Sequence, residues 1–190
     1  PITEPRVLSK GSWQSPGKRV EPGFINVLKR KQDSHWRGNG KSELAALGDW
    51  LTDTESGAGE LLARVIVNRL WHYHFGQGLV KTPNDFGNQG TPPTHPHLLD
   101  YLARRLIDSG WKLKPIHQLI LTSAVYRQKG TTNTAPMKLD AENTLLWHWR
   151  PNRLEAEAIR DSLLAVAGML KPQMYGPSIS IGHARKEVKD

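Results

Sequence analysis

Residues 59–76 read GELLARVIVNRLWHYHFG and carry the clearest helical pattern of the chain. Apolar side chains recur there at intervals of three and four, which is the spacing of one face of an α-helix. Gly76 follows the last of them, and glycine readily takes the left-handed conformation that ends a helix. The pattern predicts a helix over about 59–75, and its buried face is expected to contain Leu62, Val65, Ile66, Leu70 and Tyr73.

Two further helices are predicted on either side of this one. The first is short and begins at Ser42, whose hydroxyl can cap it. The second begins after Thr94 or His95, has Pro96 in its first turn, where the missing N–H costs nothing, and stops at Ser109-Gly110. In the short helix, the apolar face is expected to consist of Leu44, Leu47, Trp50 and Leu51.

Two more helices follow toward the C-terminus. One is opened by Pro115 and reaches about Arg127. The other begins at Asn152, the predicted N-cap, and Glu155 three residues later completes a capping box. The residues of this last helix that we expect to point inward are Ile159, Leu163, Val166, Ala167 and Leu170.

The segments between these helices are rich in glycine, proline and polar residues. Residues 76–95 form a long Gly/Pro-rich loop, and 128–139 form a polar loop. We expect a flexible basic arm or linker over 1–41, a helical domain over 42–172, and an irregular tail over 173–190. The predicted fold class is all-α, with about five amphipathic helices and an extended N-terminal arm.

Composition excludes several classes of chemistry. The 190 residues include 26 Lys and Arg against 18 Asp and Glu, which gives a net charge of +8, and a chain of this length fits one domain. There is no cysteine, so disulfides, thiolate zinc sites and cysteine nucleophiles are excluded. No apolar run approaches the roughly 18 residues that cross a bilayer, so we expect no membrane span.

Four histidines lie close together in the sequence, at His72, His74, His95 and His97. A zinc-like site needs three or four ligands that converge on one point. His72 and His74 are two residues apart at a helix end and point in opposite directions, and His95 and His97 stand on either side of a proline. We therefore expect no metal ion and no other cofactor in this chain.

A basic run, Lys29-Arg30-Lys31, lies near the aromatic residues Trp13, Phe24 and Trp36. Such an arm could neutralise phosphates and stack on bases. The rest of the chain is close to balanced in charge, and it carries no helix-turn-helix, zinc-finger or RNA-recognition signature. Nucleic-acid binding through this arm is kept only as an alternative.

A series of short motifs follows the chain between about residues 42 and 180 and resembles a known family. In order, the motifs are RVIVNRLW from Arg64, FGQGLV from Phe75, DFG from Asp85, THP from Thr94, GW at Gly110-Trp111, TSAVYR from Thr122 and RLEAEAIRD from Arg153. The family is the planctomycete-specific C-terminal domain of unknown function that accompanies cytochrome-c-like domains in large exported proteins.

This resemblance implies a mostly helical, extracytoplasmic domain that packs against companion domains of the same larger protein and has no assigned activity. Ion pairs and loop-capping hydrogen bonds explain its polar motif residues at least as well as a site does. In particular, Glu157 and Asp161 share a helix face with arginines that can neutralise them. The polar residues in motif positions are Asn68, Arg69, Asp85, His95, Arg153, Glu157, Arg160 and Asp161.

The chain departs from the family pattern at two places. An Asn-Pro pair usually precedes the long helix, whereas this chain has Glu55-Ser56-Gly57-Ala58-Gly59. The family domain also continues well past the position of Gly176-Pro177-Ser178, so we expect the tail of this chain to be truncated.

The sequence favours a non-catalytic interaction or structural module of a larger exported multidomain protein. Its tryptophans and the 76–95 loop are expected to form the contact surface. The first alternative is an enzyme in which Asp85 and His95 form an acid–base pair, which requires the two side chains to lie within hydrogen-bond reach. The second alternative is nucleic-acid binding.

Overall fold

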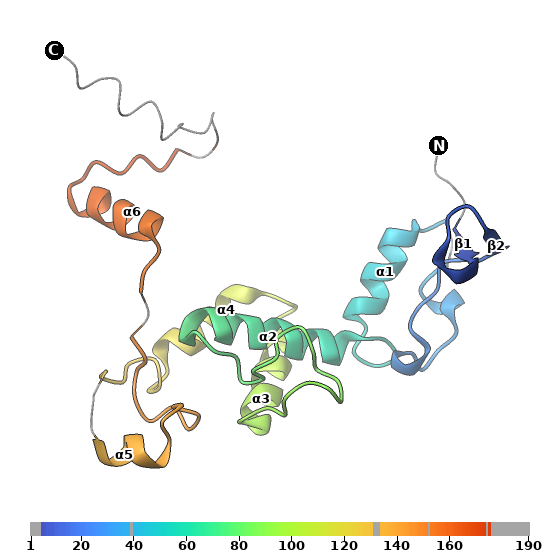
Figure 1. Cartoon of the computed structure of the whole chain (residues 1–190). Coiled ribbons are helices and arrows are strands. Elements are labelled where there is room, and N and C mark those ends of the chain that lie inside the picture. Colours follow the sequence, from blue (N-terminus) through green and yellow to red (C-terminus); the bar gives the residue numbers. More distant parts are fainter. Residues whose placement is uncertain (1–4, 39, 131–133, 152, 174, 176–190) are drawn as a thin grey trace. The chain divides into compact units, whose positions relative to one another are not determined.

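The computed structural model of the chain describes residues 5–38, 40–130, 134–151, 153–173 and 175. The chain divides into two compact units, residues 1–151 and 152–190. The boundaries that we expect after residues 41 and 172 stay predictions. The elements labelled in Figure 1 are β1 (Arg6–Leu8), β2 (Pro16–Arg19), α1 (Glu43–Thr52), α2 (Gly59–Phe75), α3 (Pro96–Asp108), α4 (Leu113–Thr122), α5 (Thr134–Leu139) and α6 (Ala156–Val166).

Helices dominate the described residues, which confirms the all-α prediction. The only sheet among them is the antiparallel pair β1–β2, in which Arg6 lies opposite Arg19. This pair and three short 3₁₀ turns lie inside the segment that we expect to be an extended arm. No described helix is both long enough and apolar enough to cross a bilayer.

Helix α2 is the centre of the first unit, because α1, α3 and α4 all contact it. Its most deeply buried apolar side chains follow one another at intervals of four: Ala63, Val67, Trp71 and Phe75. They pack in one cluster with side chains of α3 and α4. Each fully buried Leu or Ile in such a cluster contributes about 1.5 to 3 kcal/mol. The partners from α3 and α4 are Leu99, Leu102, Ala103, Leu106, Ile116 and Ile120.

The predicted face of α2 is therefore rotated from the observed one. Ile66 and Leu70 are only half-buried, and the Tyr73 side chain is 82% exposed. The large apolar residues dominate the periodicity, but the small Ala63 occupies a fully buried position, and several neighbouring elements cover α2 at once.

The helix ends follow local chemistry in most places. The Ser42 hydroxyl accepts a hydrogen bond from the N–H of Ala45 at 3.2 Å, and Gly76 is left-handed with φ of 77°, as predicted. Pro96 is the first residue of α3. However, α4 begins before Pro115 and ends at Thr122, because the Ser123 hydroxyl and backbone start a turn there instead of continuing the helix to Arg127.

Two predictions about the C-terminal half are wrong. The polar loop predicted over 128–139 contains the short helix α5. In the second unit, Glu155 occupies the N-cap position of α6 without a side-chain cap, so the predicted capping box is not formed; Asn152 lies outside the described residues.

The predicted inward face of α6 is exposed in the described structure. Leu163 and Val166 have exposed fractions of 68% and 91%, and Ile159 and Leu170 are also exposed. In the second unit the described residues form no other helix or strand that could cover this face.

The long 76–95 loop folds back on α2 and contributes to the core. Leu79 and Val80 are buried, and the buried Asn68 side chain binds the backbone of Val80 twice. Its Oδ1 accepts from the Val80 N–H at 2.8 Å, and its Nδ2 donates to the Val80 carbonyl at 3.0 Å. A Cβ at Gly78 would lie 2.8 Å from the Asn68 amide, so only glycine fits beside this clamp.

The C-terminal end of the loop is held next to its start, at Leu79. The Thr94 N–H donates to the Leu79 carbonyl at 2.8 Å, so the chain returns to the start of the loop before α3 begins. Between these ends, the Thr82 hydroxyl accepts from the Thr91 N–H and donates to the Asp85 carbonyl. The loop is thus closed at its base and cross-linked in its middle.

The Asn68 clamp leads to a stability prediction. The substitution Asn68→Ala leaves the buried N–H and C=O of Val80 without partners, so we expect the free energy of unfolding to fall by about 2 to 4 kcal/mol. Urea denaturation followed by circular dichroism measures this change. The matched control is Asn88→Ala on the exposed part of the same loop, which should change stability by less than about 0.5 kcal/mol. Equal effects of the two substitutions would contradict the clamp.

Candidate functional site

Asp85 and His95, the candidate acid–base pair, each hydrogen-bond to their own neighbours. The Asp85 Oδ1 accepts from the Gly87 N–H at 2.9 Å, which forms a tight turn. The His95 Nδ1 lies 3.0 Å from the Thr94 hydroxyl. Among the hydrogen bonds and ion pairs of the described residues, none joins Asp85 to His95. The enzyme alternative remains a prediction, and the loop geometry accounts for both residues without it.

The other polar motif residues have structural contacts or lie at the surface. Asn68 is fully buried in the clamp, and the Arg69 Nη2 donates to the Asn84 Oδ1 at 3.0 Å. Arg153 and Glu157 belong to the second unit and are exposed. In the same unit, Arg160 Nη1 lies 3.2 Å from Asp161 Oδ1, so the expected ion pair on this face is formed between neighbours. In neither unit do the motif residues converge on one point.

A small cavity lined by aromatic and basic side chains lies beside the C-terminal end of α2. Trp71, Phe75 and Trp149 give it aromatic walls, and Phe75 and Trp149 have ring centroids 5.6 Å apart. Its enclosed part has a volume of about 30 Å³, which is room for one or two water molecules. The remaining lining residues are Gln77, Gly78, Leu79, Lys81, Thr94, Val125, Asn143, Thr144, Leu146, His148 and Arg150.

One wall of this cavity is a loop that closes on itself through two polar side chains. Asp140 accepts from the N–H groups of Leu145 at 2.7 Å and Thr144 at 2.8 Å. The hydrogen bond from Leu145 has the largest effect on the pKa of Asp140 and lowers it below its ordinary value. The buried Asn143 donates to the His148 carbonyl at 2.8 Å and accepts from its N–H at 3.4 Å. His148 is thereby fixed at the cavity.

The His148 ring has an unsatisfied atom. Its Nδ1 is buried and has no hydrogen-bond partner among the described residues. A buried polar atom without a partner costs about 1 to 3 kcal/mol, so such atoms are rare and often mark a site. Sequence reasoning did not single out His148, because an isolated histidine in a polar segment carries no spacing signal.

Two histidines, His74 and His117, join α2 to α4. His74 Nε2 and His117 Nδ1 lie 2.8 Å apart, so one ring donates and the other accepts. Tyr126 meets the His74 ring edge to face at 5.7 Å. Burial lowers the pKa of His74, and the charge that His117 can carry lowers it further. Among the described residues, no group of three or more His, Asp or Glu side chains could hold a metal ion.

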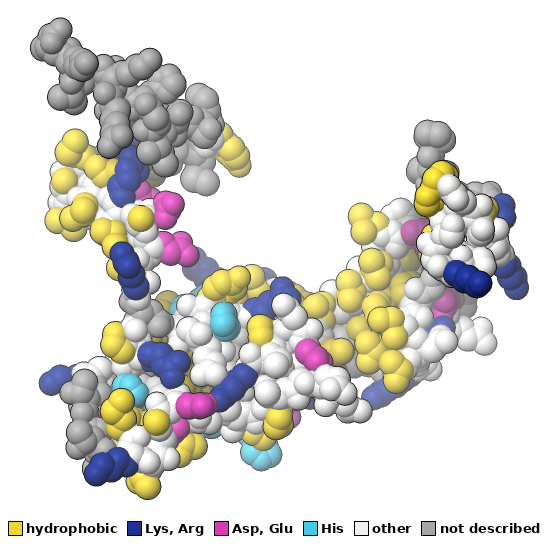
Figure 2. All heavy atoms as spheres, in the orientation of Figure 1, with side chains coloured by type: hydrophobic (Ala, Val, Ile, Leu, Met, Phe, Trp, Pro, Cys, Tyr) yellow, Lys and Arg dark blue, Asp and Glu magenta, His cyan; other side chains and the backbone are white. Residues whose placement is uncertain are grey.

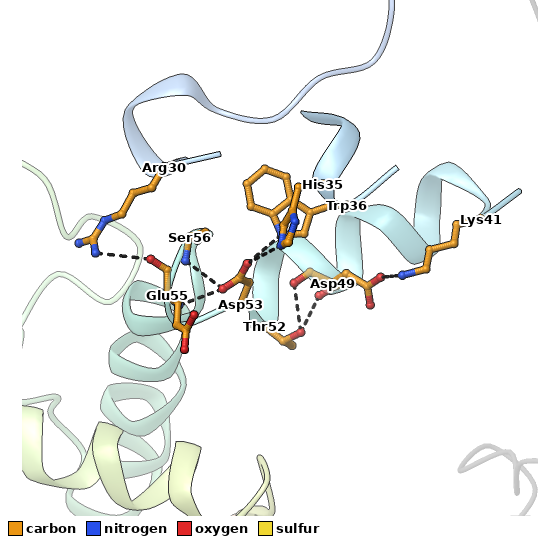
Figure 3. A network of polar contacts seen from close by, with 10 residues as sticks. Arg30, His35, Trp36, Lys41, Asp49, Thr52, Asp53, Glu55 and Ser56 are labelled. Atoms are coloured by element: carbon orange, nitrogen blue, oxygen red, sulfur yellow. Dashed lines mark hydrogen bonds and ion pairs between the residues drawn. The ribbon is translucent and has the colours of Figure 1, made fainter. Parts of the chain in front are cut away.

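The start of the first unit contains a polar and aromatic junction centred on Asp53 (Figure 3). Asp53 Oδ1 accepts from the N–H groups of Glu55 and Ser56, both at 2.9 Å, and Oδ2 accepts from the Trp36 indole at 3.0 Å. Burial raises the pKa of Asp53, but the N–H groups of Ser56 and Glu55 and the Trp36 indole outweigh it and bring the pKa below its ordinary value. Asp53 thus ties the 3₁₀ turn before Trp36 to the loop between α1 and α2.

Aromatic packing reinforces this junction. Trp36 and Trp50 are 3% and 4% exposed. The Phe24 ring lies 5.2 Å from the Trp36 ring and 5.5 Å from the Trp50 ring, and Leu28 packs on the same cluster. The segment around residues 24–36 is therefore packed on α1.

Part of the basic arm is engaged in the Asp53 junction, and nucleic-acid binding through the arm stays a prediction. Two of its three aromatic rings, Phe24 and Trp36, are packed in the junction, and Lys29 is paired with Asp33. Arg30 bonds through its backbone N–H to the Ser56 carbonyl at 2.9 Å. Of the seven tryptophans, Trp13 is exposed, three are half-buried (Trp111, Trp147 and Trp149) and three are buried (Trp36, Trp50 and Trp71), and the expected tryptophan contact surface stays a prediction.

Comparison with known families gives one match. The family model PSD1, described as a protein of unknown function (DUF1553), matches residues 44–190. The chain belongs to this family. No curated protein and no solved structure matches the chain. The expectation of a domain of unknown function is confirmed by the PSD1 match.

The PSD1 match includes only part of the Asp53 junction. Trp50 and Asp53 lie inside the matched residues, whereas Phe24, Leu28 and Trp36 lie before them. The cluster around Trp36 is therefore a contact between the PSD1 domain and a preceding segment of the same chain. The cavity, by contrast, is lined by PSD1 residues alone.

The lowered pKa of His74 predicts a pH dependence. Folding lowers the pKa of His74 below the ordinary histidine value of about 6.5, which the unfolded chain keeps. As the pH falls through that value, His74 takes up a proton in the unfolded chain before it does so in the folded protein, and this favours unfolding. The free energy of unfolding should therefore fall between about pH 7 and pH 5. Urea denaturation at several pH values measures this fall, which should be shallower in His74→Gln. In the exposed control His97→Gln, the slope of the wild type should be retained; a wild-type slope in both variants would contradict the assignment.

Proposed function

We propose that this PSD1 domain is a non-catalytic structural module that packs against neighbouring parts of a larger, exported multidomain protein. The observation that carries the proposal is the burial of Trp36 in one cluster with Trp50, with the Phe24 ring in contact with both. A segment from outside the PSD1 match supplies the aromatic side chains of this contact, and α1 supplies the surface. The domain thus already binds a neighbouring segment through α1.

The contact has the composition of a protein–protein interface core. Aromatic residues fill its centre, and a half-buried carboxylate, Asp53, accepts an indole hydrogen bond that fixes the orientation of Trp36. At its edge, the Arg37 guanidinium lies 5.7 Å from the centre of the Phe24 ring. Such features give orientation as well as affinity.

Apolar surface continues from the junction along α1. Leu44 and Leu47 are 78% and 41% exposed, on the helix that carries Trp50. Figure 2 shows hydrophobic side chains gathered on this helix. Exposed apolar side chains next to a formed contact are typical of a surface that a further partner covers. The partner that we propose is a companion domain of the same protein, because the preceding segment of that chain already occupies the adjoining surface.

The two alternatives have less support. Asp85 and His95 are each engaged in their own turns, and the aromatic rings that could stack on bases are mostly buried. The module needs no cofactor to form the contact at Trp36. An extracytoplasmic location belongs to the proposal and derives from the family resemblance.

A proteolysis experiment tests the Trp36 contact. The substitution Trp36→Ala removes the buried ring and the indole hydrogen bond to Asp53, so the segment around residues 24–37 should detach more often. Trypsin should then cleave at Lys29, Arg30 and Lys31 at least about tenfold faster, since cleavage follows the population of the open form. The control Trp13→Ala removes an exposed ring and should leave the cleavage rate unchanged. Equal cleavage of both variants and the wild type would reject the contact.

Hydrogen exchange of the α1 amides tests whether a companion domain covers this helix. We expect the amides of residues 43–52 to exchange more slowly in the longer protein than in this 190-residue chain, because a companion domain covers Leu44 and Leu47. In Leu44→Lys with Leu47→Lys, that difference should disappear. Identical exchange of α1 in both proteins would contradict the proposed function.

A further inference from the structure

The cavity beside Trp149 has a chemistry that the proposed structural role does not use. Its lining contains three residues with cationic or cation-forming side chains, Lys81, His148 and Arg150, and no aspartate or glutamate. Trp71, Phe75 and Trp149 add aromatic rings to the same lining. A cavity lined by aromatic and basic side chains discriminates between ligands by charge as well as by shape.

Most N–H donors of the Lys81 and Arg150 side chains have no hydrogen-bond partner among the described residues. Lys81 Nζ lies 2.5 Å from Glu142 Oε2, and Arg150 Nη2 donates to the Glu142 carbonyl at 2.7 Å. An ammonium has three N–H groups and a guanidinium has five, and no other protein partner of these two groups is found among the described residues. The Glu142 carboxylate does not line the cavity, and its side chain is 72% exposed.

The buried Nδ1 of His148 supplies the second, independent observation. No described residue hydrogen-bonds to it, although Asn143 holds both the N–H and the carbonyl of His148. A fixed backbone together with an unsatisfied ring atom is an arrangement that a bound molecule can complete, and completion removes the cost of the unpaired atom.

We infer that the cavity binds a small organic carboxylate with a flat apolar body. The carboxylate would accept hydrogen bonds from Lys81, Arg150 and His148, and the enclosed 30 Å³ is room for a group of that size and not for a whole ring. The apolar body would lie in the open part of the cavity against Trp149. Charge-assisted bonds of this kind are roughly twice as strong as neutral ones, which favours the carboxylate over a neutral analogue.

Benzoate is the probe, and the complete chain is titrated with it by calorimetry and by NMR of the Trp71 and Trp149 indole groups. We expect saturable binding with shifts of both indoles. Benzyl alcohol, which has the same ring without charge, should bind at least about tenfold more weakly, a difference of about 1.4 kcal/mol. Inorganic phosphate should compete only weakly, because it lacks the apolar body.

Variants assign the contacts. Arg150→Met removes the guanidinium of an exposed residue, so the variant should fold. Its affinity for benzoate should be about tenfold lower than that of the wild type. His148→Phe should weaken it as well, while circular dichroism checks that this variant folds. The matched control is Arg104→Met on α3, which lies outside the cavity and should leave affinity unchanged.

Four results would overturn the inference. Three are absence of saturable benzoate binding, equal affinity for benzyl alcohol, and wild-type affinity in Arg150→Met. The fourth is stronger binding of phosphate than of benzoate, because the site would then select an inorganic anion. The proposed structural function does not depend on any of these outcomes, since the Trp36 contact and the cavity share no residue.

Discussion

The fold of the first unit depends on a buried side-chain amide that hydrogen-bonds to both the N–H and the carbonyl of one loop residue. Asn68 lies on the central helix with no exposed surface, and its side chain satisfies both the N–H and the C=O of Val80. A long Gly/Pro-rich loop has few other means of satisfying buried backbone groups, and each group left unpaired would cost stability. The clamp therefore allows Leu79 and Val80 to enter the core and brings the chain back for α3.

A second buried asparagine solves the same problem on the other side of the cavity. Asn143 binds the N–H and the C=O of His148, as Asn68 binds those of Val80. The cavity lies between the two loops that these amides hold, so its shape depends on fixed backbone and not on side-chain rotamers alone. The Asp53 junction follows a related rule, because a half-buried carboxylate there accepts hydrogen bonds from two backbone N–H groups and one indole.

Sequence reasoning predicted what local chemistry determines. The cap at Ser42, the left-handed Gly76 and the start of α3 at Pro96 each depend on a few neighbouring residues. It failed where distant residues decide: nothing near Trp36 in the sequence indicates that its ring is buried in one cluster with Trp50, and nothing near His148 indicates a cavity. The exposed face of α6 shows the same limit, because periodicity reports an apolar face and not whether anything covers it.

The most direct test of this account is the hydrogen exchange of the Val80 amide. If Asn68 holds it, the Val80 N–H should exchange only through global unfolding, at a rate close to that of the slowest amides of α2. The amide of Asn88, in the exposed part of the loop, provides the internal comparison and should exchange far faster. Exchange of Val80 at a rate similar to Asn88 would contradict the account, because the loop would then open without unfolding the core.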